Sequence, residues 1–189
     1  MKIGVLALQG AFREHIKMLE RLGVETAEVR LPADLDGLDG LIIPGGESTT
    51  IAKLAVIYDL MEPLRQFAAH KAVWGTCAGM IFMAKDIGMD QPLLGVMDIV
   101  VERNAFGRQV DSFETGLDIV GLPGDEPFPA IFIRAPRLVD TMADVEIISQ
   151  LSDGTAVAAK QGHWLVTSFH PELTGDDRMH KMFVEMVAQ

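Results

Sequence analysis

The sequence predicts an α/β protein: one three-layer domain over residues 1–189, with a mixed, mostly parallel central sheet flanked by helices. Two observations predict it. Short apolar runs at 3–8 and 41–43 are typical of parallel strands that are buried on both faces. Helix patterns alternate with such runs, and the stretch 72–80 passes from an apolar run through a glycine-rich turn into an apolar, helix-compatible segment. This alternation is typical of a doubly wound sheet, where ligands bind at the carboxyl ends of the strands.

The individual elements follow from apolar spacing and from the residues that end each pattern. The helix pattern at 12–22 ends at Gly23, and the strand predicted at 25–31 ends at Pro32. Residues 34–40 are rich in Asp and Gly and are predicted to form a loop. Further helices are predicted at 48–55, 58–69, 80–84 and 178–187, and further strands at 71–74, 93–102, 113–120, 130–133, 146–151, 155–160 and 164–169, the last three as an antiparallel-looking run.

Composition and charge exclude several classes of protein. Apolar residues make up 49% and charged residues 23% of the chain, which is typical of a globular protein rather than a disordered one. The formal net charge of −11 disfavours nucleic acid and anionic membranes as partners. The apolar run at 3–8 is too short for a signal peptide, and no run reaches the ~18 apolar residues that would span a bilayer. We therefore expect a cytoplasmic protein.

The only cysteine of the chain lies in the sequence Gly75-Thr76-Cys77-Ala78-Gly79, so it cannot form an intramolecular disulfide. A lone cysteine is often simply a small buried apolar residue. Here, however, the small neighbours and the change from strand to helix are typical of a nucleophile elbow, which presents its central side chain at a strained turn. We therefore interpret Cys77 as a nucleophile.

A second glycine-rich segment, Pro44-Gly45-Gly46-Glu47-Ser48-Thr49-Thr50, follows the predicted strand at 41–43. Two glycines allow the backbone to approach a ligand and to turn N–H groups towards it. Ser48 or a neighbouring threonine is expected to cap the next helix. A plain connection between strand and helix would also need a glycine and a cap, so this segment alone does not decide between the two interpretations. The Gly-Lys-[Ser/Thr] ending of a phosphate-binding loop is missing.

The sequence His170-Pro171-Glu172 supplies a base and a carboxylate at the end of the last predicted strand. Because Pro171 favours an extended His170, both side chains can project to the same side. Cys77, His170 and Glu172 would then form a triad for acyl transfer or hydrolysis. The backbone N–H groups of Ala78 and of Gly46, in the Gly45-Gly46 loop, are candidate oxyanion donors. The five histidines show no metal-ligand spacing with the single cysteine, so no metal site is predicted.

These motifs resemble the triad-type (class I) glutamine amidotransferases, and more closely one branch of them, the glutaminase subunit of pyridoxal 5′-phosphate synthase. The resemblance covers essentially the whole chain. It is carried by five blocks in order, namely Leu8-Gln9-Gly10, residues 44–50, residues 102–109 (Glu-Arg-Asn-Ala-Phe-Gly-Arg-Gln), Phe132-Ile133-Arg134-Ala135-Pro136 and residues 168–174 (Ser-Phe-His-Pro-Glu-Leu-Thr).

The resemblance implies the reaction and its residues. Cys77 would attack the side-chain amide of L-glutamine, His170 would protonate the departing ammonia and activate water against the glutamyl thioester, and Glu172 would orient His170. The residues implied to hold glutamine are Gly46, Glu47, Ser48, Arg103, Ile133 and Arg134. From the residues alone, Arg103 and Arg134 could equally be solvated surface. The resemblance implies no cofactor.

The resemblance also implies a partner. Ammonia would pass to a synthase subunit, a β/α barrel that makes pyridoxal 5′-phosphate from a pentose phosphate and a triose phosphate, within a large hetero-oligomer. Activity is expected to rise when this subunit docks, because the short chain has no acceptor domain of its own. Gln9 and Gly10, at the end of the first strand, are the candidates for coupling docking to the oxyanion loop.

Three alternatives remain from the sequence. The elbow also occurs in the superfamily of intracellular proteases and stress chaperones, although residues 44–50 and 170–172 argue against it. The chain could be an interaction subunit with a vestigial triad, which the intact Cys77, His170 and Glu172 disfavour. A different ammonia acceptor, such as a nucleotide synthase or an anthranilate synthase, is disfavoured only by the resemblance to one branch.

Overall fold

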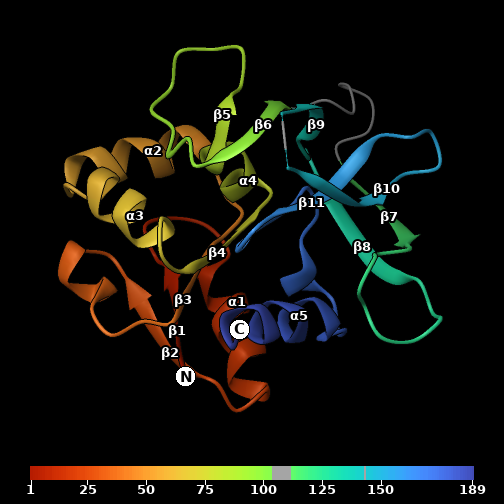
Figure 1. The fold of residues 1–189 in the computed structure, drawn as a ribbon, viewed down its shortest axis with the longest axis horizontal. Helices are drawn as coiled ribbons and strands as arrows, with labels where there is room; N and C mark the ends of the chain where they lie inside the picture. Colours follow the sequence, from red (N-terminus) through yellow and green to blue (C-terminus); the bar gives the residue numbers. More distant parts are fainter. Residues whose placement is uncertain (104–111, 143) are drawn as a thin grey trace.

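The computed structural model describes residues 1–103, 112–142 and 144–189. Most of the sequence block 102–109 therefore lies outside the described residues. The described chain forms one α/β domain, in which a curled mixed sheet lies between two layers of helices, as the sequence predicts (Figure 1).

The first part of the sheet is parallel and runs in the order β2-β1-β3-β4-β12. Its strands are β1 (Lys2–Leu6), β2 (Glu25–Val29), β3 (Gly40–Ile43), β4 (Ala72–Thr76) and β12 (Trp164–Thr167). The last strand of the chain thus inserts beside β4, so that the residues following β4 and those following β12 meet at one edge of the sheet.

Beyond β12 the pairing is mainly antiparallel, in the order β12-β11-β9-β6-β5, with β10 also paired to β11 and β5 parallel to β6. β7 and β8 form a separate antiparallel hairpin. The strands of this part are β5 (Ala84–Asp86), β6 (Met97–Glu102), β7 (Ser112–Leu117), β8 (Phe128–Ile133), β9 (Arg137–Thr141), β10 (Glu146–Gln150) and β11 (Ala156–Gln161).

Helices cover both faces of the parallel part. One layer contains α2 (Ser48–Ile57), α3 (Met61–Ala68) and α4 (Ala78–Met83), and the other contains α1 (Phe12–Arg21) and α5 (Arg178–Val187). Short 3₁₀ turns, η1 (Pro32–Leu35) and η2 (Pro171–Leu173), follow β2 and β12.

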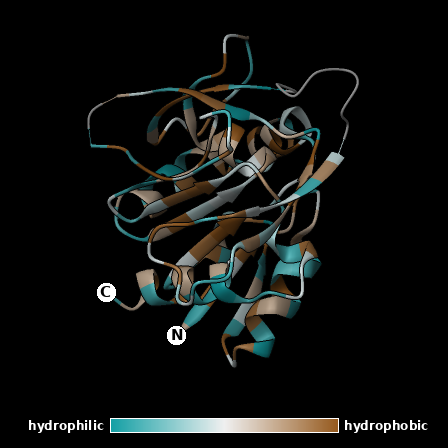
Figure 2. Ribbon diagram, turned by 90° about the vertical axis from the view of Figure 1, so that its right-hand side faces the viewer, coloured by the Kyte–Doolittle hydropathy of each residue, from teal (hydrophilic) through white to brown (hydrophobic). Residues whose placement is uncertain are grey.

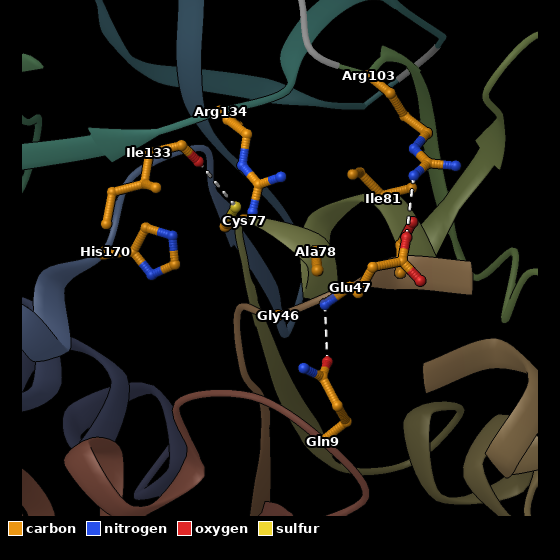
Figure 3. Close-up of a pocket in the computed structure, with 11 residues that line it drawn as sticks. Gln9, Gly46, Glu47, Cys77, Ala78, Ile81, Arg103, Ile133, Arg134 and His170 are labelled. Carbon is orange, nitrogen blue, oxygen red and sulfur yellow. Dashed lines mark hydrogen bonds and ion pairs between the residues drawn. The ribbon is translucent and has the colours of Figure 1, made fainter. Parts of the chain in front are cut away.

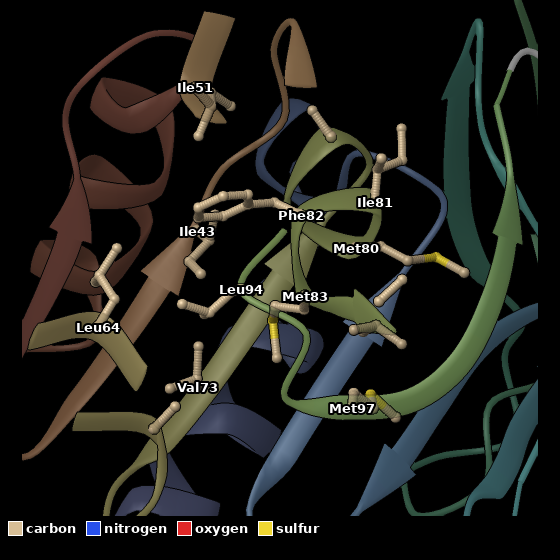
Figure 4. Close-up of a cluster of buried hydrophobic side chains, with 14 of the residues drawn as sticks. Ile43, Ile51, Leu64, Val73, Met80, Ile81, Phe82, Met83, Leu94 and Met97 are labelled. Carbon is tan, nitrogen blue, oxygen red and sulfur yellow. The ribbon is translucent and has the colours of Figure 1, made fainter. Parts of the chain in front are cut away.

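Alternating side chains of the strands separate two apolar cores. On β3, Leu41 and Ile43 face the core under α2–α4, whereas Ile42 faces the core under α1 and α5. On β4, Val73 and Trp74 divide in the same way. Figure 4 shows the first core, where α4 packs its apolar side chains onto β3 and β4. Figure 2 shows the apolar strands enclosed between helices with hydrophilic outer faces. Burial on both faces explains why these strands are continuous apolar runs.

Several predicted boundaries are wrong for local reasons. The helix predicted at 58–69 begins only at Met61, because Asp59 adopts a φ of 54° and separates α3 from α2. The strand predicted at 93–102 begins only at Met97, two residues after Gly95, whose φ is 68°.

Other differences concern strand partners and elements that the sequence did not indicate. β9 was not predicted, and the segment predicted as a loop at 34–40 begins inside η1. The strand predicted at 164–169 pairs antiparallel with β11 but parallel with β4. This parallel pairing brings His170 to the elbow.

Candidate active site

Cys77 lies in a strained turn between β4 and α4. Its φ of 49° and ψ of −103° are unusual for a residue with a side chain. Its backbone N–H donates to the carbonyl of Thr167 on β12, at 2.8 Å, which ties the turn to the neighbouring strand. This geometry confirms the predicted nucleophile elbow.

The glycines on either side of Cys77 allow the close packing that the turn requires. A methyl group at Gly79 would overlap the carbonyl oxygen of Ile43, and one at Gly75 would lie 2.6 Å from the carbonyl carbon of Gly79. Small residues therefore let α4 press against β3 and β4 immediately after the cysteine.

His170 follows β12 at the same edge and contacts Cys77. Its backbone N–H donates to the carbonyl of Ile131 of β8 at 2.8 Å, and its ring lies beside the Cys77 side chain, with both against Gly45. Its Nδ1 lies 2.7 Å from Oε1 of Glu172, whose side chain is fully buried. The chain after His170 turns into η2 and is not extended, so the turn, rather than the predicted extended backbone, brings the two side chains together.

The neighbours of His170 favour its charged form. Burial alone would lower its pKa, but hydrogen bonds with Cys77 and Glu172, and the charges of both side chains, outweigh burial and raise the pKa of His170 to about 10. A charged imidazole beside the sulfur is in the form that can donate a proton.

The glycine-rich loop packs directly against this pair. A methyl group at Gly45 would overlap the His170 ring and lie 3.3 Å from Cβ of Cys77. The carbonyl of Gly45 accepts from the N–H of Ala11 at 3.0 Å, and the N–H of Glu47 donates to Oε1 of Gln9 at 2.7 Å. The segment containing Gln9 and Gly10 is therefore hydrogen-bonded to the loop. Gly10 has a φ of 100°, and a methyl group there would overlap the carbonyl oxygen of Gly45.

Glu47 caps helix α2, whereas the sequence predicts Ser48 or a threonine as the cap. Its carboxylate accepts from the backbone N–H groups of Thr49 and Thr50 and from both hydroxyl groups. Partial burial opposes ionisation, yet these hydrogen bonds lower the pKa of Glu47 to about 2. Oε1 of Glu47 also lies 3.1 Å from Nη2 of Arg103. Glu47 therefore presents a fixed negative charge.

These side chains line one cavity of about 320 Å³ (Figure 3). All the residues implied to bind glutamine, both oxyanion candidates, Cys77 and His170 lie on its wall, whereas Glu172 lies behind His170. The lining residues are Gln9, Gly46, Glu47, Ser48, Cys77, Ala78, Ile81, Arg103, Ile133, Arg134 and His170. Of the predicted site residues, Glu172 and Gly10 do not line the cavity.

Two residues of this region were not predicted. Ile81 forms part of the wall one helical turn after Cys77, a spacing that could have indicated it. Gln91 lies 3.3 Å from the Ser48 hydroxyl and 3.4 Å from Nη1 of Arg103. It comes from an irregular segment, and no sequence pattern indicated that contact.

Among the described residues, no group of three or more His, Cys, Asp or Glu side chains could hold a metal ion. None of the helices in the described ranges is both long and apolar enough to cross a membrane.

Comparison with known proteins decides the family. Residues 5–189 match the SNO glutamine amidotransferase family. The chain belongs to this family. The protein named pyridoxal 5′-phosphate synthase subunit PdxT of Herpetosiphon aurantiacus is 58% identical over 189 residues, covering 97% of this chain and 99% of its own. The protein of the same name from Bacillus licheniformis is 55% identical over 189 residues, covering 99% of this chain and 95% of its own.

A solved structure described as a glutamine amidotransferase has the same fold. It is 49% identical to this chain, and its TM-score is 0.93 over 99% of both chains. Membership of the glutamine amidotransferase family, to which the sequence motifs pointed, rules against the alternative assignment to the protease and chaperone superfamily.

Proposed function

We propose that this glutamine amidotransferase hydrolyses L-glutamine to L-glutamate and ammonia through Cys77, His170 and Glu172, and supplies the ammonia to a synthase subunit that makes pyridoxal 5′-phosphate. The family and the names of its relatives support the reaction. The observation that carries the catalytic assignment is that Cys77 and His170 lie side by side on the wall of one cavity, with Glu172 hydrogen-bonded to Nδ1 of the His170 ring.

Each member of the triad has a defined role. Sγ of Cys77 attacks the amide carbon of the glutamine side chain, and the proton held on His170 passes to the amide nitrogen as ammonia leaves. This step leaves a glutamyl thioester on Cys77. His170 then removes a proton from a water molecule that attacks the thioester, which releases glutamate and returns Cys77 and His170 to their starting states, with a proton again on His170. Glu172 holds Nδ1 of His170 throughout, so that the other ring nitrogen faces the sulfur.

The oxyanion that forms during both steps needs two N–H donors. The N–H of Ala78 comes directly after the nucleophile, at the start of α4. The second donor is a backbone N–H of the glycine loop, with Gly46 on the cavity wall. Gly45 and Gly46 carry no side chains that would block this approach, which explains the need for two glycines.

The remaining cavity residues suit the two charged ends of glutamine. Glu47 provides a carboxylate for the α-ammonium group, and Arg103 and Arg134 provide cations for the α-carboxylate. Ser48 and Ile133 complete the wall around the aliphatic part of the substrate. We assign no cofactor to this reaction.

The synthase partner is proposed to be a β/α barrel that assembles with this chain in a large hetero-oligomer, in the cytoplasm. Gln9 and Gly10 are proposed to couple docking to the oxyanion loop. Their contacts with that loop support this role, because a shift of the 9–10 segment would move Gly45 and the N–H of Glu47 directly.

Covalent labelling tests the proposed nucleophile. Because Cys77 is the only cysteine, an electrophilic glutamine analogue should modify one residue only, and excess glutamine should slow the reaction. Peptide mass spectrometry identifies the modified residue. The same reagent should leave the Cys77→Ala variant unmodified. Complete loss of activity with Cys77 unmodified would contradict the proposal. A native chain without glutaminase activity in the presence of the synthase subunit would favour an interaction subunit with a vestigial triad.

A further inference from the structure

Two histidines that the mechanism does not use lie directly behind the triad. His15 comes from α1 and His180 from α5, and both are completely buried. Neither lines the cavity. They pack around Trp74, with ring centroids 5.7 Å and 5.0 Å from it in edge-to-face arrangements. Buried imidazoles need hydrogen-bond partners, so their contacts indicate what they do.

A continuous series of polar contacts connects these histidines to Glu172. Nε2 of His180 lies 3.0 Å from Nδ1 of His15. Nε2 of His15 lies 3.4 Å from Oε2 of Glu172 and 3.2 Å from the hydroxyl of Thr76, the residue before Cys77. Oε1 of Glu172 is the oxygen that holds His170. The two oxygens of one carboxylate therefore face two different histidines.

His15, His180, Thr76 and Glu172 form a buried polar cluster, and its unpaired atoms indicate which ring nitrogens carry protons. Among the described residues, Oε2 of Glu172 and Nδ1 of His180 are buried and have no hydrogen-bond partner of good geometry. If Nε2 of His15 carries its proton, it donates to the Thr76 hydroxyl and lies 3.4 Å from Oε2, and Nδ1 of His15 accepts from Nε2–H of His180. A lone pair of His180 then stays unpaired, and Oε2 has the His15 N–H as a nearby donor, at a distance of 3.4 Å between the heavy atoms. The opposite tautomers would bury an unpaired N–H of His180 and leave Oε2 without the His15 donor. Burying an unpaired N–H costs more free energy than burying an unpaired lone pair.

Both histidines are neutral under ordinary conditions, as these tautomers require. Burial, and then the neighbouring His180 and His170, lower the pKa of His15 well below its usual value. Burial lowers the pKa of His180 to about 4, against the opposing effect of Asp177 at the start of α5. A neutral N–H donor stabilises the charged carboxylate without competing with His170 for its proton.

We propose that His15 is a positioning residue, which directs its Nε2–H at Oε2 of Glu172 and so holds the carboxylate in the orientation that His170 needs, with His180 fixing the tautomer of His15. This proposal rests on the proposed triad. It extends the series of interacting side chains from the cavity to α1 and α5, and it gives two buried histidines a function that packing alone would not require.

Replacement of His15 by Phe tests the proposal, because the aromatic packing on Trp74 stays while the donor is lost. We expect kcat for glutamate release in the complex with the synthase subunit to fall about tenfold, since the N–H that faces the Glu172 carboxylate is removed. KM should change less than about twofold, because His15 does not reach the cavity. The His15→Gln variant, which can place an amide N–H near Oε2, should restore most of the loss.

A control and a double-mutant cycle separate positioning from general destabilisation. Leu19→Ala removes a fully buried side chain from the same helix but no hydrogen-bond donor or acceptor from the cluster, so it should lower stability and leave kcat unchanged. In the Glu172→Gln background, His15→Phe should have no further effect. The rate at which iodoacetamide alkylates the single cysteine can be compared among the native chain, the two single variants and the double variant, even where turnover is slow.

Three outcomes would overturn the proposal: a loss in His15→Phe that is equally large in the Glu172→Gln background, a change in KM alone, or a matching loss in Leu19→Ala. Full activity of Glu172→Gln would contradict the proposed triad itself, which distinguishes that failure from failure of the His15 proposal. If His15→Phe does not fold, His180→Leu gives the same comparison, because it removes the donor that fixes the His15 tautomer.

Discussion

At the scale of single residues, the site depends on charges and conformations that oppose ordinary preferences. Cys77 adopts a backbone conformation that side chains usually avoid, and His170 favours its charged form although it is largely buried. The hydrogen bond from the Cys77 N–H to the carbonyl of Thr167 holds the backbone of Cys77, and the carboxylate of Glu172 stabilises the charged His170. Such strain at a single buried cysteine is typical of a site arranged for reaction.

The charge state of His170 gives a prediction at this scale. Its imidazole should titrate with a midpoint near pH 10 rather than near 6.5, because Cys77 and Glu172 outweigh the effect of burial. The group is therefore protonated at neutral pH and loses its proton only as the pH rises through about 10. Nitrogen NMR of labelled histidine measures this midpoint. It should fall in Glu172→Gln, where the negative partner is lost; an unchanged midpoint would contradict the role of Glu172.

At the scale of elements, the turn from β4 to α4 is the part of the fold most closely tied to function. Gly75 and Gly79 bring the helix against β3, and Gly45 brings the neighbouring loop against His170. These glycines are required by contact rather than by backbone conformation, because a Cβ at each would meet another group.

The Gly79→Ala variant tests this packing. Its methyl group would overlap the carbonyl of Ile43, a backbone atom that cannot move aside, so we expect a loss of about 1–3 kcal/mol in the free energy of unfolding and reduced activity. Gly175→Ala is a matched control, because its methyl group would meet nothing within 4 Å. Denaturant unfolding measures both variants. Equal stability of the two would show that α4 does not need this close approach.

Local sequence patterns predicted the buried strands, the helices and the elbow, because burial on both faces and small residues at close contacts leave clear signals. These patterns failed where contacts between distant parts of the chain determine the local structure. β9, with Asp140 and Thr141 near its end, is a strand because it pairs with β6, and Glu47 is the helix cap because four donors of Thr49 and Thr50 surround its carboxylate. The contacts of His15 with Glu172 join residues 157 positions apart, so no local pattern reveals them.

At the scale of the molecule, the site is assembled from both parts of the sheet. The parallel part supplies the elbow and the glycine loop, and β12 supplies His170 at the border with the antiparallel part. The hairpin β7–β8 brings Ile133 and Arg134 over the cysteine, and the carbonyl of Ile133 lies 4.0 Å from its sulfur. Each of these groups depends on the arrangement of the whole domain, which is why the candidate residues are so widely spaced in the sequence.

The proposed dependence on a partner belongs to this scale. Glutamate release should rise when the synthase subunit is added, and the stimulation should be smaller in Gln9→Ala, because the contact of Gln9 with the N–H of Glu47 is lost. Gln66→Ala, an exposed change on α3, should be stimulated like the native chain. Assays with and without the synthase subunit give both ratios. Equal rates in the two conditions for the native chain would contradict the coupling.

The central claim is that glutamine is hydrolysed by way of Cys77. Its most direct test is the rate of glutamate release by the Cys77→Ala variant, assembled with the synthase subunit and saturated with glutamine. We predict a fall of about 10⁴-fold or more relative to the native chain, because no other group in the cavity can form the thioester. A rate within about tenfold of the native one would contradict the account.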